Sequence, residues 1–189
     1  MEYSAKFIVI YLLMQIGLTV GGYFYYYSFI KRMYLKKQEL PLIIGFSQLF
    51  IFLSHGIILH LPYYVFTSWP KISAGIFQQI VGFTVGFIAV LLLFSGFINL
   101  GAFSKTMGTN SRKLTTKGLY KVSRNPQVIG YSLLIATYAI LWPSWYIILS
   151  LTSYGIIIHR MVLTEEIHLQ NVFGADYKDY CKTTPRYVF

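Results

Sequence analysis

The chain has 189 residues, of which 56% are hydrophobic, 19% aromatic and only 12% charged, and its mean hydropathy is +0.56. Soluble domains are about 45–50% apolar and about 25% charged, so this composition excludes an ordinary soluble protein and indicates a membrane protein. The net charge of +10 does not indicate nucleic-acid binding, because the basic residues lie in loops between apolar runs of lipid-spanning length.

Five apolar segments follow one another, and we expect each to form a membrane helix. They are Phe7–Ile30, Pro41–Leu61, Gly75–Leu100, Pro126–Leu141 and Trp145–Leu163. About 20 residues cross the hydrocarbon core, so the first three are long enough, whereas the fourth extends only about 24 Å. Pro143 cannot continue a helix, so the last two segments are expected to form a tight helical hairpin.

The resulting prediction is an all-α integral membrane protein with about five transmembrane helices. Residues 1–100 would form a three-helix transmembrane region. Residues 101–189 would add a polar loop, the hairpin and a cytoplasmic tail within the same structural domain, with a pocket built from this C-terminal half. The first apolar segment is too long for the core of a signal peptide, so we interpret it as a retained span.

Lysine and arginine residues predict the orientation of the chain, because basic loops stay in the cytoplasm. Lys6 and Lys71 fall on one side, and the other fourteen of the 16 fall on the opposite side. We therefore expect the N-terminus outside and the C-terminus inside. The fourteen are Lys31, Arg32, Lys36, Lys37, Lys105, Arg112, Lys113, Lys117, Lys121, Arg124, Arg160, Lys178, Lys182 and Arg186.

Small and polar residues within the apolar segments are expected to serve packing. Two pairs of glycines four apart, at 17 and 21 and at 82 and 86, would let helix backbones approach closely. His55 and His60 are expected to be hydrogen-bonded or interfacial, since no carboxylate or cysteine accompanies them at ligand spacing. Gln48, Gln78 and Gln79 are expected to bond between helices or lie at the interface. We expect no metal site, and the single cysteine, Cys181, excludes an internal disulfide.

The start of the fourth apolar segment has the features of an anion site. Asn125 is a favoured N-cap residue and Pro126 a favoured first helical residue, so a helix is expected to begin here beside Arg124. Its free amides and positive dipole end would attract an anion. The alternative is that Asn125 only caps the helix while Arg124 meets lipid headgroups.

Four of the six carboxylates lie in the last quarter of the chain. Glu165 and Glu166 end the fifth apolar run, and the helix is expected to continue to a cap at Gly174. One interpretation of the pair is a solvated helix end. The other is the acidic side of a site, because the hairpin brings the pair to the same interface as Arg124. A zwitterionic cofactor would match both charges, with Tyr177 and Tyr180 supplying rings for stacking or for a cationic group.

These motifs, in this order, resemble the isoprenylcysteine carboxyl methyltransferase and phospholipid methyltransferase family of integral membrane enzymes. That family carries Gly-x-Tyr-x-x-x-Arg-His-Pro-x-Tyr, an apolar hairpin, Glu-Glu and a Phe-Gly-x-x-Tyr-x-x-Tyr tail. This chain carries GLYKVSRNPQV from Gly118, EE at Glu165, and FGADYKDY from Phe173. It departs from the pattern at Asn125, where the family has His, and at Val128, where the family has Tyr.

The resemblance implies S-adenosylmethionine bound at the cytoplasmic face and a methyl group transferred to a lipophilic acceptor, such as a prenylcysteine carboxylate or a lipid amine, that enters from the membrane lipids. It implies catalytic roles for Arg124 and Glu166. The implied cofactor-binding residues are Tyr120, Arg124, Asn125, Pro126, Gln127, Glu165, Tyr177 and Tyr180.

Two other functions stay open at this point. Membrane sterol reductases have a comparable hairpin and use NADPH, and Arg112 and Lys113 would suit its additional phosphate. A non-catalytic membrane protein is the other alternative, for which Asn125 is the best argument.

Overall fold

The computed structural model describes residues 5–36, 41–65, 74–100 and 114–188, and every regular element among them is helical. The predicted all-α fold is therefore confirmed. The elements are α1 (Ala5–Phe24), the π-helical turn η1 (Tyr25–Ile30), α2 (Lys31–Lys36), α3 (Leu42–Val65), α4 (Ile76–Leu100), the 3-10 turn η2 (Gly118–Lys121), α6 (Pro126–Leu141) and α7 (Trp145–Thr183).

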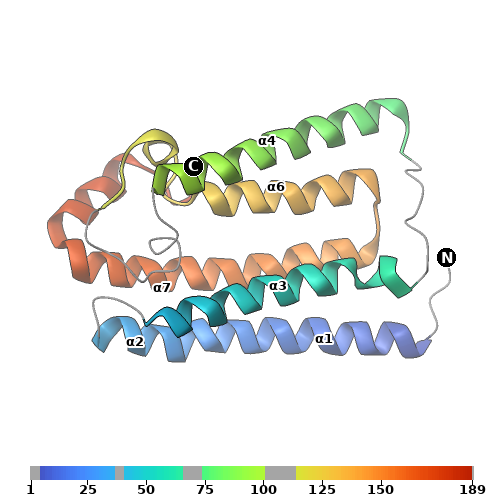
Figure 1. Cartoon of the computed structure of the whole chain (residues 1–189), viewed down its shortest axis with the longest axis horizontal. Helices are drawn as coiled ribbons and strands as arrows, with labels where there is room; N and C mark the ends of the chain where they lie inside the picture. Colours follow the sequence, from blue (N-terminus) through green and yellow to red (C-terminus); the bar gives the residue numbers. More distant parts are fainter. Residues whose placement is uncertain (1–4, 37–40, 66–73, 101–113, 189) are drawn as a thin grey trace.

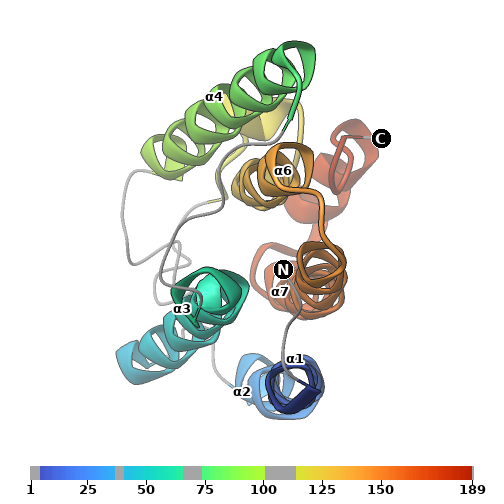
Figure 2. The same cartoon turned by 90° about the vertical axis from the view of Figure 1, so that its right-hand side faces the viewer.

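The long helices lie side by side along the long axis of the molecule (Figure 1). Seen end-on, α6 and α7 lie in the middle, with α4 on one side and α1 and α3 on the other (Figure 2). α7 contacts α1, α2, α3 and α6, whereas α4 packs on α6 and η2. α7 is thus the central helix of the bundle.

One end of the bundle, which we call the basic end, gathers α2, η2, the end of α4 and the start of α6 (Figure 1). The start of α1 and the turn between α6 and α7 lie at the opposite end. The orientation prediction also uses Lys37, Lys71, Lys105, Arg112 and Lys113, which lie outside the described residues. The domain boundary predicted at residue 100 adjoins the same undescribed stretch and stays a prediction.

Helix length and composition make the chain a multi-pass membrane protein. The continuous helix Ala5–Lys36, α3, α4 and α7 are each long and apolar enough to cross a bilayer, and α6 is a shorter apolar helix. Large apolar side chains point outward, among them Phe50, Phe77 and Phe94, each at least 65% exposed. Apolar surface of this extent suits lipid, where helices satisfy their own backbone hydrogen bonds.

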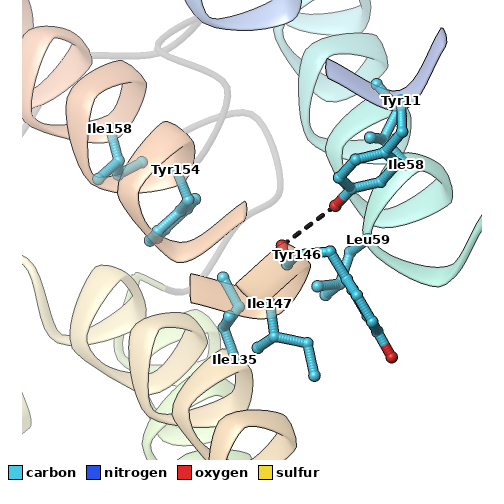
Figure 3. Packing of buried hydrophobic residues seen from close by; sticks show 8 residues of the cluster. All are labelled: Tyr11, Ile58, Leu59, Ile135, Tyr146, Ile147, Tyr154 and Ile158. Carbon is cyan, nitrogen blue, oxygen red and sulfur yellow. Dashed lines mark hydrogen bonds between the residues drawn. The ribbon is translucent and has the colours of Figure 1, made fainter. Parts of the chain in front are cut away.

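The interior of the bundle joins α1, α3, α6 and α7 through aromatic and aliphatic side chains (Figure 3). Tyr11 is fully buried and donates a hydrogen bond to the Tyr146 carbonyl at 3.1 Å. This bond joins α1 to the start of α7, and it gives the buried hydroxyl group the hydrogen-bond partner that it needs. The cluster consists of Tyr11, Ile58, Leu59, Ile135, Tyr146, Ile147, Tyr154 and Ile158.

The two intramembrane histidines of α3 are hydrogen-bonded to neighbouring helices. The Nε2 atom of His55 lies 3.0 Å from the Ser150 carbonyl oxygen, and its Nδ1 atom lies 3.4 Å from the Tyr131 hydroxyl. The Nε2 atom of His60 lies 2.9 Å from the Tyr138 hydroxyl. The prediction that both histidines are hydrogen-bonded or interfacial is therefore confirmed, and both are hydrogen-bonded.

The glutamines behave in two ways. Gln78 donates to the Ile140 carbonyl of α6, so its predicted role between helices is confirmed. Gln48 likewise bonds to the Tyr34 phenol of α2. Gln79 instead donates to the Ala74 carbonyl just before its own helix, so it does not join two helices.

Glycines let α4 and α6 approach closely. A Cβ atom at Gly82 or Gly86 would lie 2.5 Å from Leu141 or 3.1 Å from Thr137, so the predicted packing role of this pair is confirmed. The prediction is wrong for the pair at positions 17 and 21, where a Cβ would meet no described atom within 4 Å. On α1 it is Gly22 that faces α7, because a Cβ there would lie 3.1 Å from Ile157.

The helical hairpin has the predicted boundaries. α6 ends at Leu141 and α7 begins at Trp145, with Pro143 between them. α7 runs past the predicted apolar segment to Gly174, whose φ of 52° interrupts the helix. A positive φ favours glycine because it has no Cβ. The helix then continues to Thr183, so Gly174 is a kink that turns the last two turns toward η2 and α6 (Figure 1).

Candidate functional site

The first part of the candidate site consists of η2 and residues 122–125, which connect η2 to α6. Gly118 has a φ of 59°, which lets the chain turn sharply into η2. Pro126 begins α6, as predicted, and Asn125 occupies the N-cap position. The Asn125 side chain does not cap the helix, however. Its Nδ2 atom donates to the Arg186 carbonyl at 3.0 Å, so the predicted capping contact is wrong.

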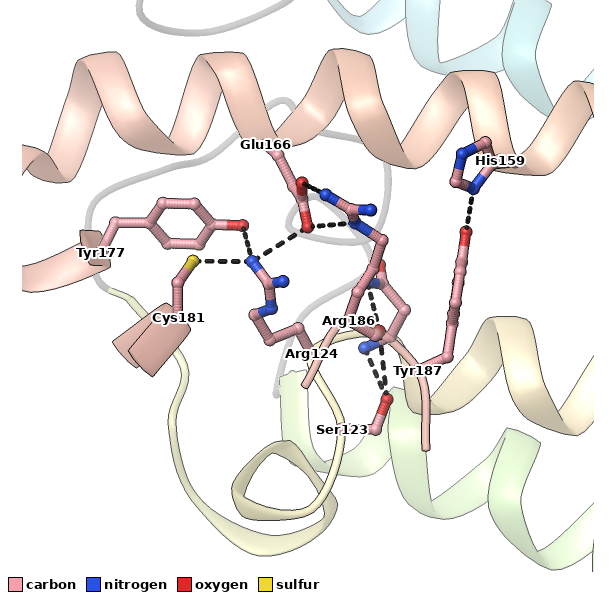
Figure 4. A network of polar contacts seen from close by, with 9 residues as sticks. Ser123, Arg124, His159, Glu166, Tyr177, Cys181, Arg186 and Tyr187 are labelled. Atoms are coloured by element: carbon pink, nitrogen blue, oxygen red, sulfur yellow. Dashed lines mark hydrogen bonds and ion pairs between the residues drawn. The ribbon is translucent and has the colours of Figure 1, made fainter. Parts of the chain in front are cut away.

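Two arginines meet one glutamate at the centre of the site (Figure 4). Arg124 Nη1 lies 2.9 Å from Glu166 Oε1. Arg186 makes a bidentate contact, with Nε 2.9 Å from Oε1 and Nη2 2.7 Å from Oε2. The Arg124 and Glu166 side chains are only 12% and 15% exposed, whereas Arg186 is 35% exposed. The three side chains carry one net positive charge.

Two side chains from the last turns of α7 contact Arg124. Its Nη1 atom donates to Cys181 Sγ at 2.6 Å and to the Tyr177 hydroxyl at 3.4 Å. Its Nε atom is buried and has no hydrogen-bond partner among the described residues. A buried guanidinium nitrogen without an acceptor is costly, and an anionic ligand would supply one.

Two tyrosines connect η2 to its neighbours. The Tyr120 hydroxyl donates to Gln127 Oε1 at 2.7 Å, and the Tyr180 hydroxyl donates to the Tyr120 carbonyl at 2.6 Å. Burial raises the pKa of the Tyr120 phenol well above its usual range, against the opposing effect of the Gln127 hydrogen bond. The Tyr120 phenol therefore stays protonated and donates its hydrogen bond to Gln127.

Glu165 faces a different environment from Glu166, although the two are adjacent. Its carboxylate lies near enough to the phenols of Tyr26, Tyr34 and Tyr120 to interact with them electrostatically. No lysine or arginine of the described residues forms an ion pair with it. Successive helical residues point about 100° apart, so one glutamate binds the arginines while the other faces tyrosines.

The structure brings all the predicted site residues to the basic end, from η2, the start of α6 and the second half of α7. The distance between Arg124 and Glu166 differs from expectation. The sequence predicts that they hold opposite ends of one ligand, but they contact each other directly. The physical reason is that a mostly buried charge is stable only when paired.

Sequence analysis missed three contributors to the site. The sequence identifies Arg186 only as a basic residue of the tail, and it gives neither Ser123 nor Cys181 a place in the site. Ser123 accepts the Asn125 amide at 3.0 Å and its hydroxyl faces the Arg186 carbonyl at 3.4 Å. The scarcity of carboxylates is a usable signal, because a mostly buried carboxylate is stable only when it is paired, and Arg186 is the first basic residue after the end of α7.

Among the residues that the structure describes, no group of three or more His, Cys, Asp or Glu side chains could hold a metal ion. The donor set instead consists of guanidinium groups, phenols, an amide and two carboxylates. These groups bind polar organic molecules through hydrogen bonds and charge.

Comparison with known proteins identifies the family. The family model for phospholipid methyltransferases matches residues 77–176, which is more than half of the chain. The match covers α4, η2, α6 and α7 as far as the kink, and it includes Arg124 and both glutamates. No curated protein and no solved structure gives a significant match. The chain therefore belongs to the phospholipid methyltransferase family, as the order of its motifs predicts.

Proposed function

We propose that this protein is an integral membrane methyltransferase that uses S-adenosylmethionine and methylates a lipophilic acceptor. The observation that carries the proposal is the cluster at the basic end of the bundle in which Glu166, Tyr177 and Cys181 contact Arg124 (Figure 4). Tyr120 bonds to Gln127 and Tyr180 bonds to Tyr120 in the same part of the bundle. Arg124 and both glutamates lie within the part of the chain that the family model matches. The family supplies the reaction class, and the cluster supplies the candidate site.

The residues present fit the chemical groups of this cofactor. A carboxylate of the cofactor would satisfy the buried Nε atom of Arg124 and the positive end of the α6 dipole. Because Asn125 does not cap α6, the first amides of this helix receive no side-chain bond from it. Glu165, which has no ion pair within the described part of the chain, suits an ammonium or hydroxyl group.

Each protein group has a distinct proposed task. When bound, S-adenosylmethionine supplies an electrophilic methyl group on a positively charged sulfur. Arg124, Asn125, Pro126 and Gln127 at the start of α6 bind and orient it, since alignment carries much of such a transfer. The rings of Tyr120, Tyr177 and Tyr180 offer surfaces for a base or a cation.

The two glutamates divide the remaining work. Both oxygens of Glu166 accept hydrogen bonds from arginines, so Glu166 is available to fix Arg124 rather than to take a proton. Glu165 is the better proton acceptor because no cation neutralises it among the described residues. A lipid amine must lose one proton on methylation, and a carboxylate acceptor need not.

The acceptor would reach this site from the membrane. The basic end lies where the apolar helix surfaces give way to polar residues, and we propose that it faces the cytoplasm because basic loops stay there. Incorporation of labelled methyl groups from S-adenosylmethionine tests the proposal. Purified protein should label an organic-soluble product when given vesicles containing aminophospholipid or a prenylcysteine derivative. Absence of label with both acceptors, in protein that is folded, would contradict it.

A further inference from the structure

The segment that follows α7, Thr184–Val188, is fastened across the candidate site by side-chain and backbone contacts. We call it the strap. The Arg124 amide donates to the Pro185 carbonyl at 3.0 Å, and the Tyr187 hydroxyl lies 3.0 Å from His159 Nδ1 (Figure 4). The strap thereby joins the loop before α6 to the middle of α7. It lies outside the residues that the family model matches.

Arg186 is the residue through which the strap reaches the charged centre. Its Nε and Nη2 atoms hold both oxygens of Glu166, which fixes the rotation of that carboxylate. The hydrogen bond with Glu166 raises the pKa of Arg186, so its charge is secure. Arg124 also binds one oxygen of Glu166. Because both arginines share this carboxylate, the position of Arg124 depends on Arg186.

Asn125 fastens the strap from the other side. Its Nδ2 atom donates to the Arg186 carbonyl at 3.0 Å, and the Ser123 hydroxyl lies 3.4 Å from the same oxygen. The side-chain nitrogen of Asn125 thus donates to the strap, and its side-chain oxygen does not cap α6. The family pattern has His at this position. The contact with the strap gives the Asn of this chain a specific task.

We propose that Arg186 is a positioning residue of the cofactor site, which orients Glu166 and through it Arg124, and that Asn125 latches the strap that carries it. The inference rests on the proposed function, because the site it completes is the proposed S-adenosylmethionine site. Arg186 is not assigned a contact with substrate or cofactor.

Four variants separate this role from a general effect on folding. Arg186→Lys keeps the charge but loses the bidentate fork, and Arg186→Ala removes both. Asn125→Asp removes the amide donor yet keeps a residue that caps helices well, so α6 should not be weakened. Lys182→Ala is the matched control, since the Lys182 side chain is 75% exposed and forms a surface ion pair with Asp179.

Calorimetric binding of S-adenosylhomocysteine and hydrogen exchange of the strap amides, both on the full chain in detergent, test the inference. We expect Arg186→Ala to weaken binding on the order of tenfold or more, and Arg186→Lys to weaken it less, because hydrogen bonds to a charged group are lost. Strap exchange should accelerate in both and in Asn125→Asp. The KM for the acceptor should change little, and Lys182→Ala should match the wild type in every measurement.

The outcomes are distinguishable. Wild-type affinity in Arg186→Ala, while the unaltered protein binds S-adenosylhomocysteine normally, would overturn the inference and leave the proposed function intact. No binding by the unaltered protein would overturn both. If Arg186→Ala fails to fold, Arg186→Lys decides: unchanged affinity and unchanged strap exchange would contradict the role, and a loss of several-fold in affinity would support it.

Discussion

At the scale of single residues, the arrangement that defines the site is one carboxylate held between two guanidinium groups. Local sequence indicates a cationic helix start at Arg124 and an acidic pair at Glu165, and it predicts that they share one interface. It cannot show that Arg186 returns to the same carboxylate, because that contact depends on the kink at Gly174 and the path of the strap.

Removing the carboxylate of Glu166 should destabilise the protein more than removing the side chain of Arg124. Glu166→Gln leaves the mostly buried Arg124 without a carboxylate, so we expect a loss of about 3 kcal/mol in the free energy of unfolding and of cofactor binding. Arg124→Ala leaves Glu166 paired with Arg186, so stability should fall less although cofactor binding is still lost. Chemical unfolding and calorimetry measure the two effects.

The surface pair of Lys182 and Asp179 is the control for this prediction. Both side chains are more than 70% exposed, so Lys182→Ala should change stability by only about 0–1 kcal/mol. Equal losses of stability in Glu166→Gln and Lys182→Ala would show that the central glutamate does not neutralise a buried charge.

At the scale of elements, hydrophobic runs and helix signals predicted most of the fold. α6 has the predicted boundaries because Pro126 starts it and Pro143 prevents its continuation. The first helix passes its predicted end at Ile30 and reaches Lys36 through a π-helical turn. That extension could not be predicted, because charged residues such as Lys31 form helix as readily as loop and packing against α7 decides.

The contact between α4 and α6 should depend on Gly130. A Cβ there would lie 2.8 Å from the Leu93 amide nitrogen and 3.0 Å from the Ala89 carbonyl oxygen, both backbone atoms that cannot move independently. We expect Gly130→Ala to destabilise the protein by about 1–3 kcal/mol through overpacking. Thermal unfolding in detergent measures the change.

Gly155→Ala provides the matched control for that contact. A Cβ at Gly155 meets no described atom within 4 Å, and alanine favours helix, so its unfolding temperature should be unchanged or higher. A variant Gly130→Ala that unfolds at the wild-type temperature would show that α4 and α6 are not so closely packed.

At the scale of the whole molecule, the described basic residues lie unevenly along the long axis of the bundle. The short helix α2 and the turn η2, which carry basic residues, lie at the basic end, and the start of α1, which includes Lys6, lies at the opposite end (Figure 1). The flanks of the bundle are apolar, and we propose that its basic end faces the cytoplasm because basic loops stay there.

Epitope tags on the two ends test this orientation. In intact cells, an antibody that cannot cross the membrane should reach a tag at the N-terminus and should reach one at the C-terminus only after permeabilisation. Antibody access to the C-terminal tag in intact cells would contradict the cytoplasmic placement of the site, whatever its chemistry.

The central claim is that the basic end of the bundle binds S-adenosylmethionine, and calorimetric titration of the purified protein tests it most directly. Saturable binding of S-adenosylhomocysteine is expected, with no binding of NADPH and with binding lost in Arg124→Ala. Saturable binding of NADPH alone, or of neither molecule by folded protein, would contradict the claim.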